Sequence, residues 1–191
     1  MSSESLPSLL HNRWSVPVLA ELARGDVAGG RFANLNRSLG VSRESLRRTL
    51  AALAEAGRVT RNPGHGHPLR ADYVLTEAGK RVAPVCASLV EALDAAGLEA
   101  LGRKKWLLPV VLALSAGPAR FSGLRAELKP ISARALALAL KELEAASVIE
   151  RKLVDDYPPR AEYRLAAAGD VAGLLAPLAE LARFGATGAQ R

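Results

Sequence analysis

One stretch decides the fold and occurs twice, as VSRESLRRTLAALAEAGRVT at residues 41–60 and as ISARALALALKELEAASVIE at residues 131–150. In both copies leucines recur three or four positions apart, which is the spacing of one apolar face of an α-helix. A serine stands just before each pattern, and serine is a preferred helix N-cap because its hydroxyl accepts a hydrogen bond from a free backbone N–H. We therefore predict a helix after Ser42 and another after Ser132, each leading into a β-strand.

The similarity between the two stretches continues toward the C-terminus. An offset of 90 positions holds without a gap from residues 42–79 to residues 132–169, and it aligns the RADY segment that begins at Arg70 with the RAEY segment that begins at Arg160. Matched leucines alone would be expected by chance in a leucine-rich chain, but a shared order of Arg, Ala, acid and Tyr would not.

The similarity also continues toward the N-terminus. Trp14 and Trp106 stand 92 positions apart in similar contexts, and RFANL at residues 31–35 recurs as RFSGL at residues 120–124. Repeats of this kind indicate that one supersecondary unit has been duplicated. We therefore predict two modules, at residues 1–90 and 91–191.

Each module has the pattern of helix, helix, turn, helix and β-hairpin, which describes a winged helix-turn-helix. The first helix begins near the tryptophan, with Pro17 or Pro109 in its first turn, where proline is tolerated. The predicted fold class is mainly α with small β-hairpin wings, in two tandem winged helix-turn-helix modules. A predicted helix from about residue 78 to 101 joins the modules without a Gly/Ser-rich or Pro-rich linker, so we expect them to be rigidly coupled.

The composition is that of a folded globular protein, with 49% hydrophobic residues and a formal net charge of +7. A basic balance points weakly to a polyanionic partner. Cys86 is the one cysteine, which excludes an internal disulfide and fits a cytoplasmic location. The N-terminal residues lack the pattern of a signal peptide, and no run approaches 18 apolar residues, so no membrane span is expected.

The second copy carries the clearer family resemblance, through GRKKW at residues 102–106, RFSGLRAEL at residues 120–128, the helix stretch at residues 131–151 and PPRAEYRLAAAG at residues 158–169. These motifs resemble the HxlR family of bacterial winged-helix transcriptional regulators. The first copy matches more loosely, through RFANL, VSRESLRRTLAAL and LRADYVLTEAG, and the two copies cover nearly the whole chain.

The resemblance implies that double-stranded DNA is the partner, that the helix after Ser42 binds it, and that the wing contacts its backbone. It also implies dimerisation through terminal helices in members with a single module. A chain with two modules departs from that pattern. We expect either a monomer in which the two modules form a pseudo-dimer or a homodimer of tandem chains, and we leave a small-molecule effector open.

The first module has the basic surface that a DNA reader needs, because its residues 31–70 hold eight basic and two acidic residues. Arginine reads guanine edges and neutralises phosphates. The predicted DNA-binding residues of this module are Ser42, Arg43, Ser45, Arg47 and Arg48 on the helix, and Arg61, His65, His67 and Arg70 on the wing.

The second module is less basic on the helix and the wing that would face DNA. Ala133, Ala137 and Leu138 stand in place of Arg43, Arg47 and Arg48, and the wing contains Asp155 and Asp156. We predict contacts to the DNA backbone from Arg134, Lys152 and Arg160. An exposed Ala/Leu face also marks interfaces, so the alternative function is a protein-interaction module that kept the fold and lost DNA reading.

No other chemistry is predicted. Neither a Ser/His/Asp or Cys/His set nor a glycine-rich phosphate loop occurs, so we expect no enzyme activity and no cofactor. His65 and His67 are too few ligands for a metal site. Cys86, on an apolar helix, is interpreted as a buried structural residue rather than a redox switch, and Trp14 and Trp106 as core residues.

Overall fold

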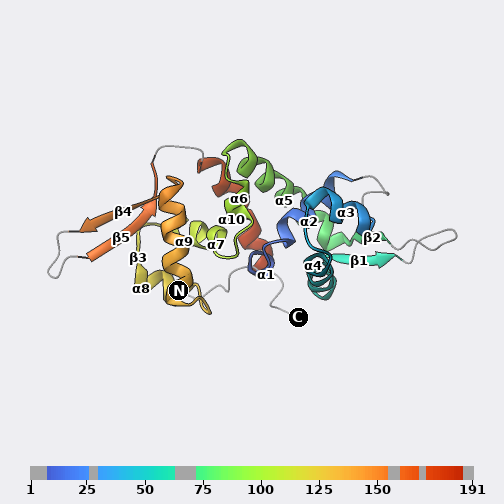
Figure 1. The fold of residues 1–191 in the computed structure, drawn as a ribbon, viewed down its shortest axis with the longest axis horizontal. Coiled ribbons are helices and arrows are strands. Elements are labelled where there is room, and N and C mark those ends of the chain that lie inside the picture. The colour runs from blue at the N-terminus through green and yellow to red at the C-terminus, as the bar shows by residue number, and fades with distance from the viewer. Residues whose placement is uncertain (1–7, 26–29, 63–71, 155–159, 168–170, 187–191) are drawn as a thin grey trace. The chain divides into compact units, whose positions relative to one another are not determined.

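The computed structural model describes residues 8–25, 30–62, 72–154, 160–167 and 171–186 (Figure 1). Its chain divides into two compact units by internal contacts. The first unit is Asn12–Glu91, and the second unit combines Met1–His11 with Ala92–Arg191. The N-terminal helix therefore belongs to the same unit as the second repeat. The module boundary between residues 90 and 91 stays a prediction.

The first unit is a winged helix-turn-helix. Its elements in chain order are α2 (Ser15–Arg24), α3 (Phe32–Leu39), α4 (Arg43–Glu55), β1 (Val59–Asn62), β2 (Asp72–Leu75) and the larger part of α5 (Glu77–Ala95). The two strands form an antiparallel hairpin in which Val59 lies opposite Leu75 and Asn62 lies opposite Asp72.

Local sequence explains where α4 begins and ends. Gly40 takes a left-handed backbone, with φ 58°, in the turn after α3, and Gly57 takes one with φ 64° after α4. The Ser42 hydroxyl accepts a hydrogen bond from the Ser45 backbone N–H at 3.2 Å, so Ser42 is the N-cap that the sequence predicts. The leucines of α4 are buried against α2 and β1, and the opposite face of the helix is left to solvent.

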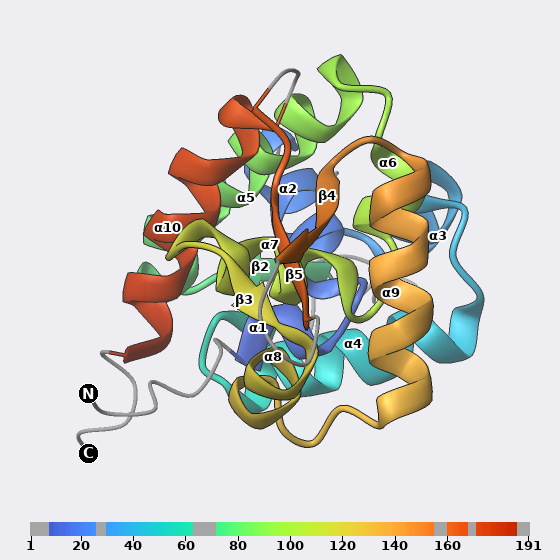
Figure 2. The ribbon, with the colours of Figure 1, turned by 90° about the vertical axis from the view of Figure 1, so that its left-hand side faces the viewer.

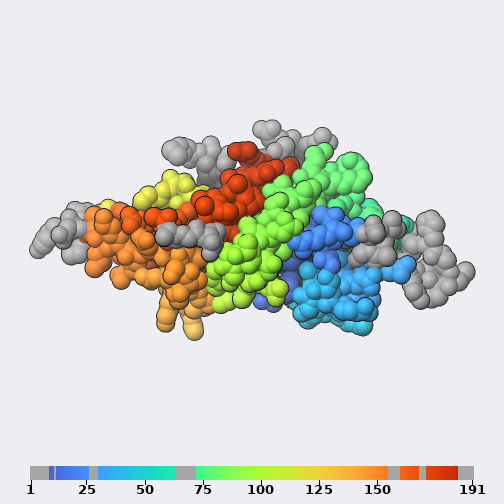
Figure 3. All heavy atoms as spheres, turned by 90° about the horizontal axis from the view of Figure 1, so that it is seen from above, coloured from blue at the N-terminus to red at the C-terminus, as the bar shows by residue number. Residues whose placement is uncertain are grey.

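The second unit repeats this plan. Its elements are α1 (Ser8–His11), the end of α5, α6 (Glu99–Gly102), α7 (Leu107–Ser115), β3 (Ala119–Arg120), α8 (Phe121–Glu127), α9 (Ala133–Ala145), β4 (Ile149–Val154), β5 (Arg160–Leu165) and α10 (Ala172–Ala186). The apolar α7 packs against α9, α10 and α1 (Figure 2). Leu174, Leu178 and Leu181 of α10 are buried, and the outer side of that helix forms part of the surface (red in Figure 3).

The predicted fold class is confirmed, with three differences in detail. The helix expected over residues 78–101 is two helices, because the chain turns at Gly97, with φ 64°, between α5 and α6. The second unit has a third strand, β3, which pairs with β5. Trp14 and Trp106 are half-buried rather than core residues, and Arg13 and Lys105 lie over their rings at 5.6 and 5.1 Å from the centroids.

Cys86 lies in the core of the first unit, as the sequence predicts. Its side chain is fully buried on α5. Burial raises the pKa of its thiol to about 12, and the nearby Arg58 opposes that rise only in part. None of the helices in the described part of the chain has the length and apolar character needed to span a bilayer.

Candidate nucleic-acid interface

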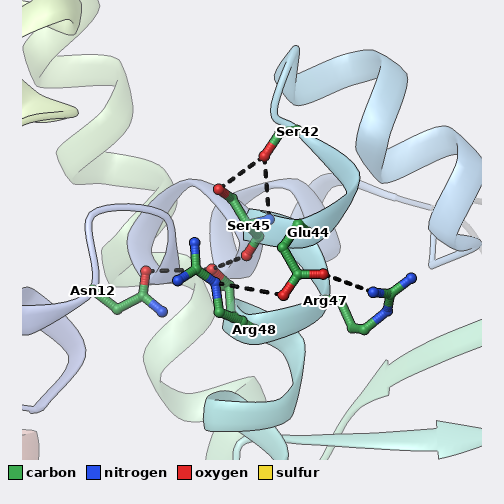
Figure 4. A network of polar contacts seen from close by, with 7 residues as sticks. Asn12, Ser42, Glu44, Ser45, Arg47 and Arg48 are labelled. Carbon is green, nitrogen blue, oxygen red and sulfur yellow. Dashed lines mark hydrogen bonds and ion pairs between the residues drawn. The ribbon is translucent and has the colours of Figure 1, made fainter.

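The exposed face of α4 carries the predicted DNA-reading side chains (Figure 4). Arg43, Arg47 and Arg48 are all exposed, because the apolar residues between them turn into the core. The structure therefore brings these three arginines together on the first two turns of one helix. Among the described residues, Arg43 makes no ion pair, so its charge is available to a partner.

Glu44 lies among these arginines and pairs with two of them. Its Oε2 accepts a hydrogen bond from Arg47 Nη1 at 2.7 Å, and its Oε1 lies 3.9 Å from Arg48 Nε. All three side chains are more than 60% exposed, so solvent screens both pairs. Figure 4 shows the carboxylate between the two guanidinium groups.

The hydroxyls of Ser42 and Ser45 form hydrogen bonds at the start of α4. The Ser42 hydroxyl donates to Ser45 Oγ at 2.9 Å as well as accepting from the Ser45 backbone N–H. Ser42 is exposed and Ser45 is half-buried. Both serines hold the first turn of α4 in place, and Arg43 stands in that turn.

The buried side of α4 is anchored by a polar contact to the chain before α2. Thr49 is 1% exposed, and its Oγ1 lies 2.9 Å from the Ser45 carbonyl oxygen and 3.3 Å from Asn12 Oδ1. Asn12 Oδ1 also accepts a hydrogen bond from the Trp14 backbone N–H at 3.1 Å. This contact fixes α4 relative to the turn at the start of α2.

The hairpin of the first unit is described in part. Arg61 is exposed on β1, opposite Tyr73 on β2. His65, His67 and Arg70 lie outside the described residues, so their predicted contacts stay predictions.

The equivalent helix of the second unit has the same architecture and a different surface. The Ser132 hydroxyl caps α9 by accepting from the Ala135 backbone N–H at 3.2 Å. Ala133, Arg134 and Ala137 are exposed, and Leu138 is 56% exposed. The apolar face predicted from the sequence is therefore at the surface, and Arg134 is the one basic side chain on the first two turns of α9.

Two basic side chains on the strands of the second unit are paired with acids. Arg164 donates to Glu150 Oε2 at 2.6 and 2.9 Å, and Arg120 Nε donates to Glu162 Oε1 at 3.3 Å. Lys152 and Arg160 are exposed, and Leu153 beside Lys152 is 65% exposed. Asp155 and Asp156 lie outside the described residues.

An open groove of about 440 Å³ follows α8 and the turn before α9. It is lined by Phe121, Arg125, Lys129 and their neighbours. Arg125 and Lys129 are exposed and were not predicted as site residues. They stand four positions apart, and this spacing is the sequence signal that could have placed them on one face.

Both halves of the chain match one family. Residues 9–97 and residues 101–190 each match the model of the HxlR-like helix-turn-helix family. The chain belongs to the HxlR-like helix-turn-helix family. The resemblance stated from the sequence motifs is confirmed, and so is the tandem arrangement of two domains.

Individual curated relatives align with less than half of the chain. An uncharacterized HTH-type transcriptional regulator of Bacillus subtilis, YvaP, is 39% identical over 75 residues, which are 39% of this chain and 67% of that protein. Another from Halalkalibacterium halodurans is 37% identical over 77 residues, 40% of this chain and 66% of that protein. The alignments thus span about two thirds of these relatives.

A solved structure, the reduced form of the transcriptional regulator YodB from B. subtilis, is 29% identical to this HxlR-like chain, with a TM-score of 0.40. The match covers 47% of this chain and 85% of that one.

Proposed function

We propose that this DNA-binding transcriptional regulator reads double-stranded DNA chiefly through α4 of its first unit. The observation that supports the proposal is the contrast between two equivalent helices. Helix α4 exposes Arg43, Arg47 and Arg48, whereas α9 exposes alanine and leucine at the same positions. A helix that enters the major groove needs side chains able to bond to base edges, and arginine forms such bonds with guanine.

The other predicted residues of the first unit have supporting roles in this proposal. Ser42 and Ser45 hold the start of α4, so that the arginines are presented in one orientation. Arg61, His65, His67 and Arg70 contact the DNA backbone from the wing. Contacts of this kind position a protein on the duplex without reading its sequence.

The second unit adds contacts to phosphate in this proposal, without base reading. Arg134, Lys152 and Arg160 supply the charges, and Arg125 and Lys129 in the groove along α8 extend the basic surface. The alternative function, an interaction module without DNA reading, fits Leu138 and Leu153 but leaves the arginines of α4 without a role. The first function is therefore favoured.

The two domains act together as a pseudo-dimer within one cytoplasmic polypeptide. This part of the proposal is supported by the two matched domains of one chain, since two copies of a module in one chain supply the two halves that a dimer of single-module chains would supply. Sedimentation equilibrium should then give the 20.1 kDa mass of one chain. A mass of two chains would instead indicate a homodimer of tandem chains. No effector is assigned.

The main experiment is a DNA-binding titration with the full chain. The probe is a duplex selected by the chain from a random library, compared with a scrambled duplex of the same composition. Arg43→Ala combined with Arg47→Ala should abolish the preference for the selected duplex, because each bidentate contact to a base contributes about 1–3 kcal/mol of discrimination. The wild-type affinity should also fall as salt rises, because bound phosphates release counterions.

Lys80→Ala combined with Arg81→Ala is the control, because it also removes two positive charges. Both residues are exposed on α5, outside both α4 and the β1–β2 hairpin. This double substitution should leave the preference unchanged. If the arginine double variant keeps the wild-type preference, α4 is not the reading helix.

A further inference from the structure

Glu44 is an acidic residue at the centre of a surface proposed to face DNA. It is the only acid among the first twelve residues of α4, and it is 62% exposed. A carboxylate placed there repels phosphate groups. Its presence therefore weakens the very contacts that Arg43, Arg47 and Arg48 would make, unless the carboxylate has a role of its own on the DNA.

Helix stability accounts for only a small part of the choice of an acid at this position. An acid in the first turn interacts favourably with the helix dipole, and exposed ion pairs add little to stability. The second unit supplies the comparison. Helix α9 has the same length of 13 residues and the same serine cap, yet it has no acid in its first turn and places Arg134 where α4 places Glu44. The helix thus forms without an acid at this position.

The ion pairs of Glu44 suggest what the carboxylate does. It holds Arg47 at 2.7 Å and approaches Arg48 at 3.9 Å, so the arginines nearest to it are partly neutralised before any DNA is bound. In the major groove, a carboxylate can accept a hydrogen bond from the N4 amino group of cytosine or from the N6 amino group of adenine. Adenine carries the N7 acceptor beside its amino group, whereas cytosine presents its amino group without one, and glutamate and aspartate pair with cytosine N4. At guanine, at thymine and beside phosphate, the carboxylate meets an acceptor and is penalised.

We propose that Glu44 is the specificity-determining residue of the reading helix. Its carboxylate accepts a hydrogen bond from the N4 amino group of a cytosine, while Arg47 exchanges part of its pairing with Glu44 for contact with the DNA. Away from a matching site, the carboxylate keeps Arg47 and Arg48 paired and lowers affinity for DNA in general. This inference rests on the proposed function of α4 and names the base that one of its residues reads.

The test compares Glu44→Gln with Glu55→Gln in the full chain. Glu55 is an exposed residue at the last position of the same helix, so both variants change the charge of α4 equally and only one changes it among the arginines. Binding is measured to the selected duplex, to the scrambled duplex, and to a set of selected duplexes with every single base-pair substitution.

Glu44→Gln should bind the scrambled duplex about threefold more tightly, because a repulsive charge near the phosphates is gone. Its preference for the selected duplex should fall about tenfold, within the range of one base contact. In the substitution set, the wild type should lose affinity when one particular C·G pair is replaced by any other base pair. Glu44→Gln should bind the duplexes with those replacements as well as it binds the selected duplex. Glu55→Gln should reproduce none of these changes.

The outcomes separate this inference from the proposed function. If Glu44→Gln keeps the wild-type preference and base requirements while Arg43→Ala with Arg47→Ala loses them, α4 reads DNA and the role assigned to Glu44 is wrong. If the arginine variant also keeps the preference, the proposed function itself fails. Urea unfolding should give a slightly lower midpoint for Glu44→Gln than for Glu55→Gln, because an acid is favourable in the first turn of a helix and unfavourable in the last. A lower midpoint for Glu44→Gln with unchanged base requirements would show a purely structural role and overturn the proposal.

Discussion

Ser147 and Gly57 occupy equivalent places at the ends of α9 and α4, and both have a left-handed backbone, with φ values of 57° and 64°. Their backbone N–H groups bond in the same way, to the carbonyl oxygens of Glu144 and Ala54 at 3.0 and 2.9 Å. A residue with a Cβ pays about 1–2 kcal/mol for this conformation, and glycine does not. The second unit therefore ends its helix with a strain that the first unit avoids.

Ser147→Gly should stabilise the second unit by about 1 kcal/mol, because it removes this strain at an exposed position. The measurement is the midpoint of urea unfolding. Gly57→Ser, the reverse exchange, should lower stability by a similar amount. A midpoint for Ser147→Gly at or below that of the wild type would show that the Ser147 side chain makes a compensating contribution.

The two N-cap serines allow stability and DNA binding to be separated. Ser42→Ala and Ser132→Ala each remove a hydroxyl that accepts from a backbone N–H at 3.2 Å. Each should cost about 1 kcal/mol of stability, the usual contribution of such a cap. Only Ser42→Ala should weaken binding to the selected duplex, since only α4 is proposed to read bases.

Thermal unfolding and DNA titration of the two cap variants give the comparison. Similar losses of stability are the control that both caps were removed. If Ser132→Ala weakens DNA binding as much as Ser42→Ala does, the two helices contribute equally, and the asymmetry proposed between the units is wrong.

The sequence predicted the parts of the fold that depend on short-range patterns. The apolar spacing and serine caps of α4 and α9 are local signals, and the repeat doubled their weight. The break between α5 and α6 was missed although Gly97 was visible, because a single glycine also occurs within helices. The packing of α1 on the second unit could not be predicted, since a helix of four residues carries no signal of a partner so distant in the chain.

The candidate site also has parts that local sequence patterns predict and parts that they do not. The exposed arginines of α4 follow from helical spacing, and so does the ion pair of Glu44 with Arg47 three positions later, which was not among the predictions. The contact between Asn12 and Thr49 joins residues 37 positions apart and depends on how α2 packs on α4. No local pattern specifies such packing.

Cys86 should be unreactive in the folded chain. Its thiol is buried, and burial raises its pKa to about 12, whereas the thiolate is the reactive form. At pH 8 a disulfide reagent should therefore label native protein only as fast as the first unit opens, and should label urea-unfolded protein at once. Rapid labelling of the native chain would contradict the burial of Cys86.

The same thiol predicts a loss of stability at high pH. The unfolded thiol has an ordinary pKa of 9.0, and the folded thiol has one of about 12. Between these values the unfolded chain gives up a proton that the folded chain keeps, so the contribution is complete below about pH 9 and is lost as the pH rises toward 12. Cys86→Ala should weaken the dependence of the free energy of unfolding on pH over this range, apart from a constant difference in stability.

A gain of function on α9 tests the division of labour between the units. Ala137→Arg combined with Leu138→Arg gives the second unit the equivalents of Arg47 and Arg48. Both positions are exposed, so the substitutions should leave the core intact. The double variant should bind all DNA more tightly, and the logarithmic salt dependence should steepen by about 0.9 for each phosphate newly neutralised.

Ala172→Arg combined with Ala176→Arg is the matched control. Both alanines are exposed on α10, so this variant adds the same charge to the same unit away from α9. A steeper salt dependence for the α9 variant than for the α10 variant would place α9 against the phosphates. Equal slopes would mean that only net charge matters, and that the second unit stands away from the DNA while α4 of the first unit carries the contact alone.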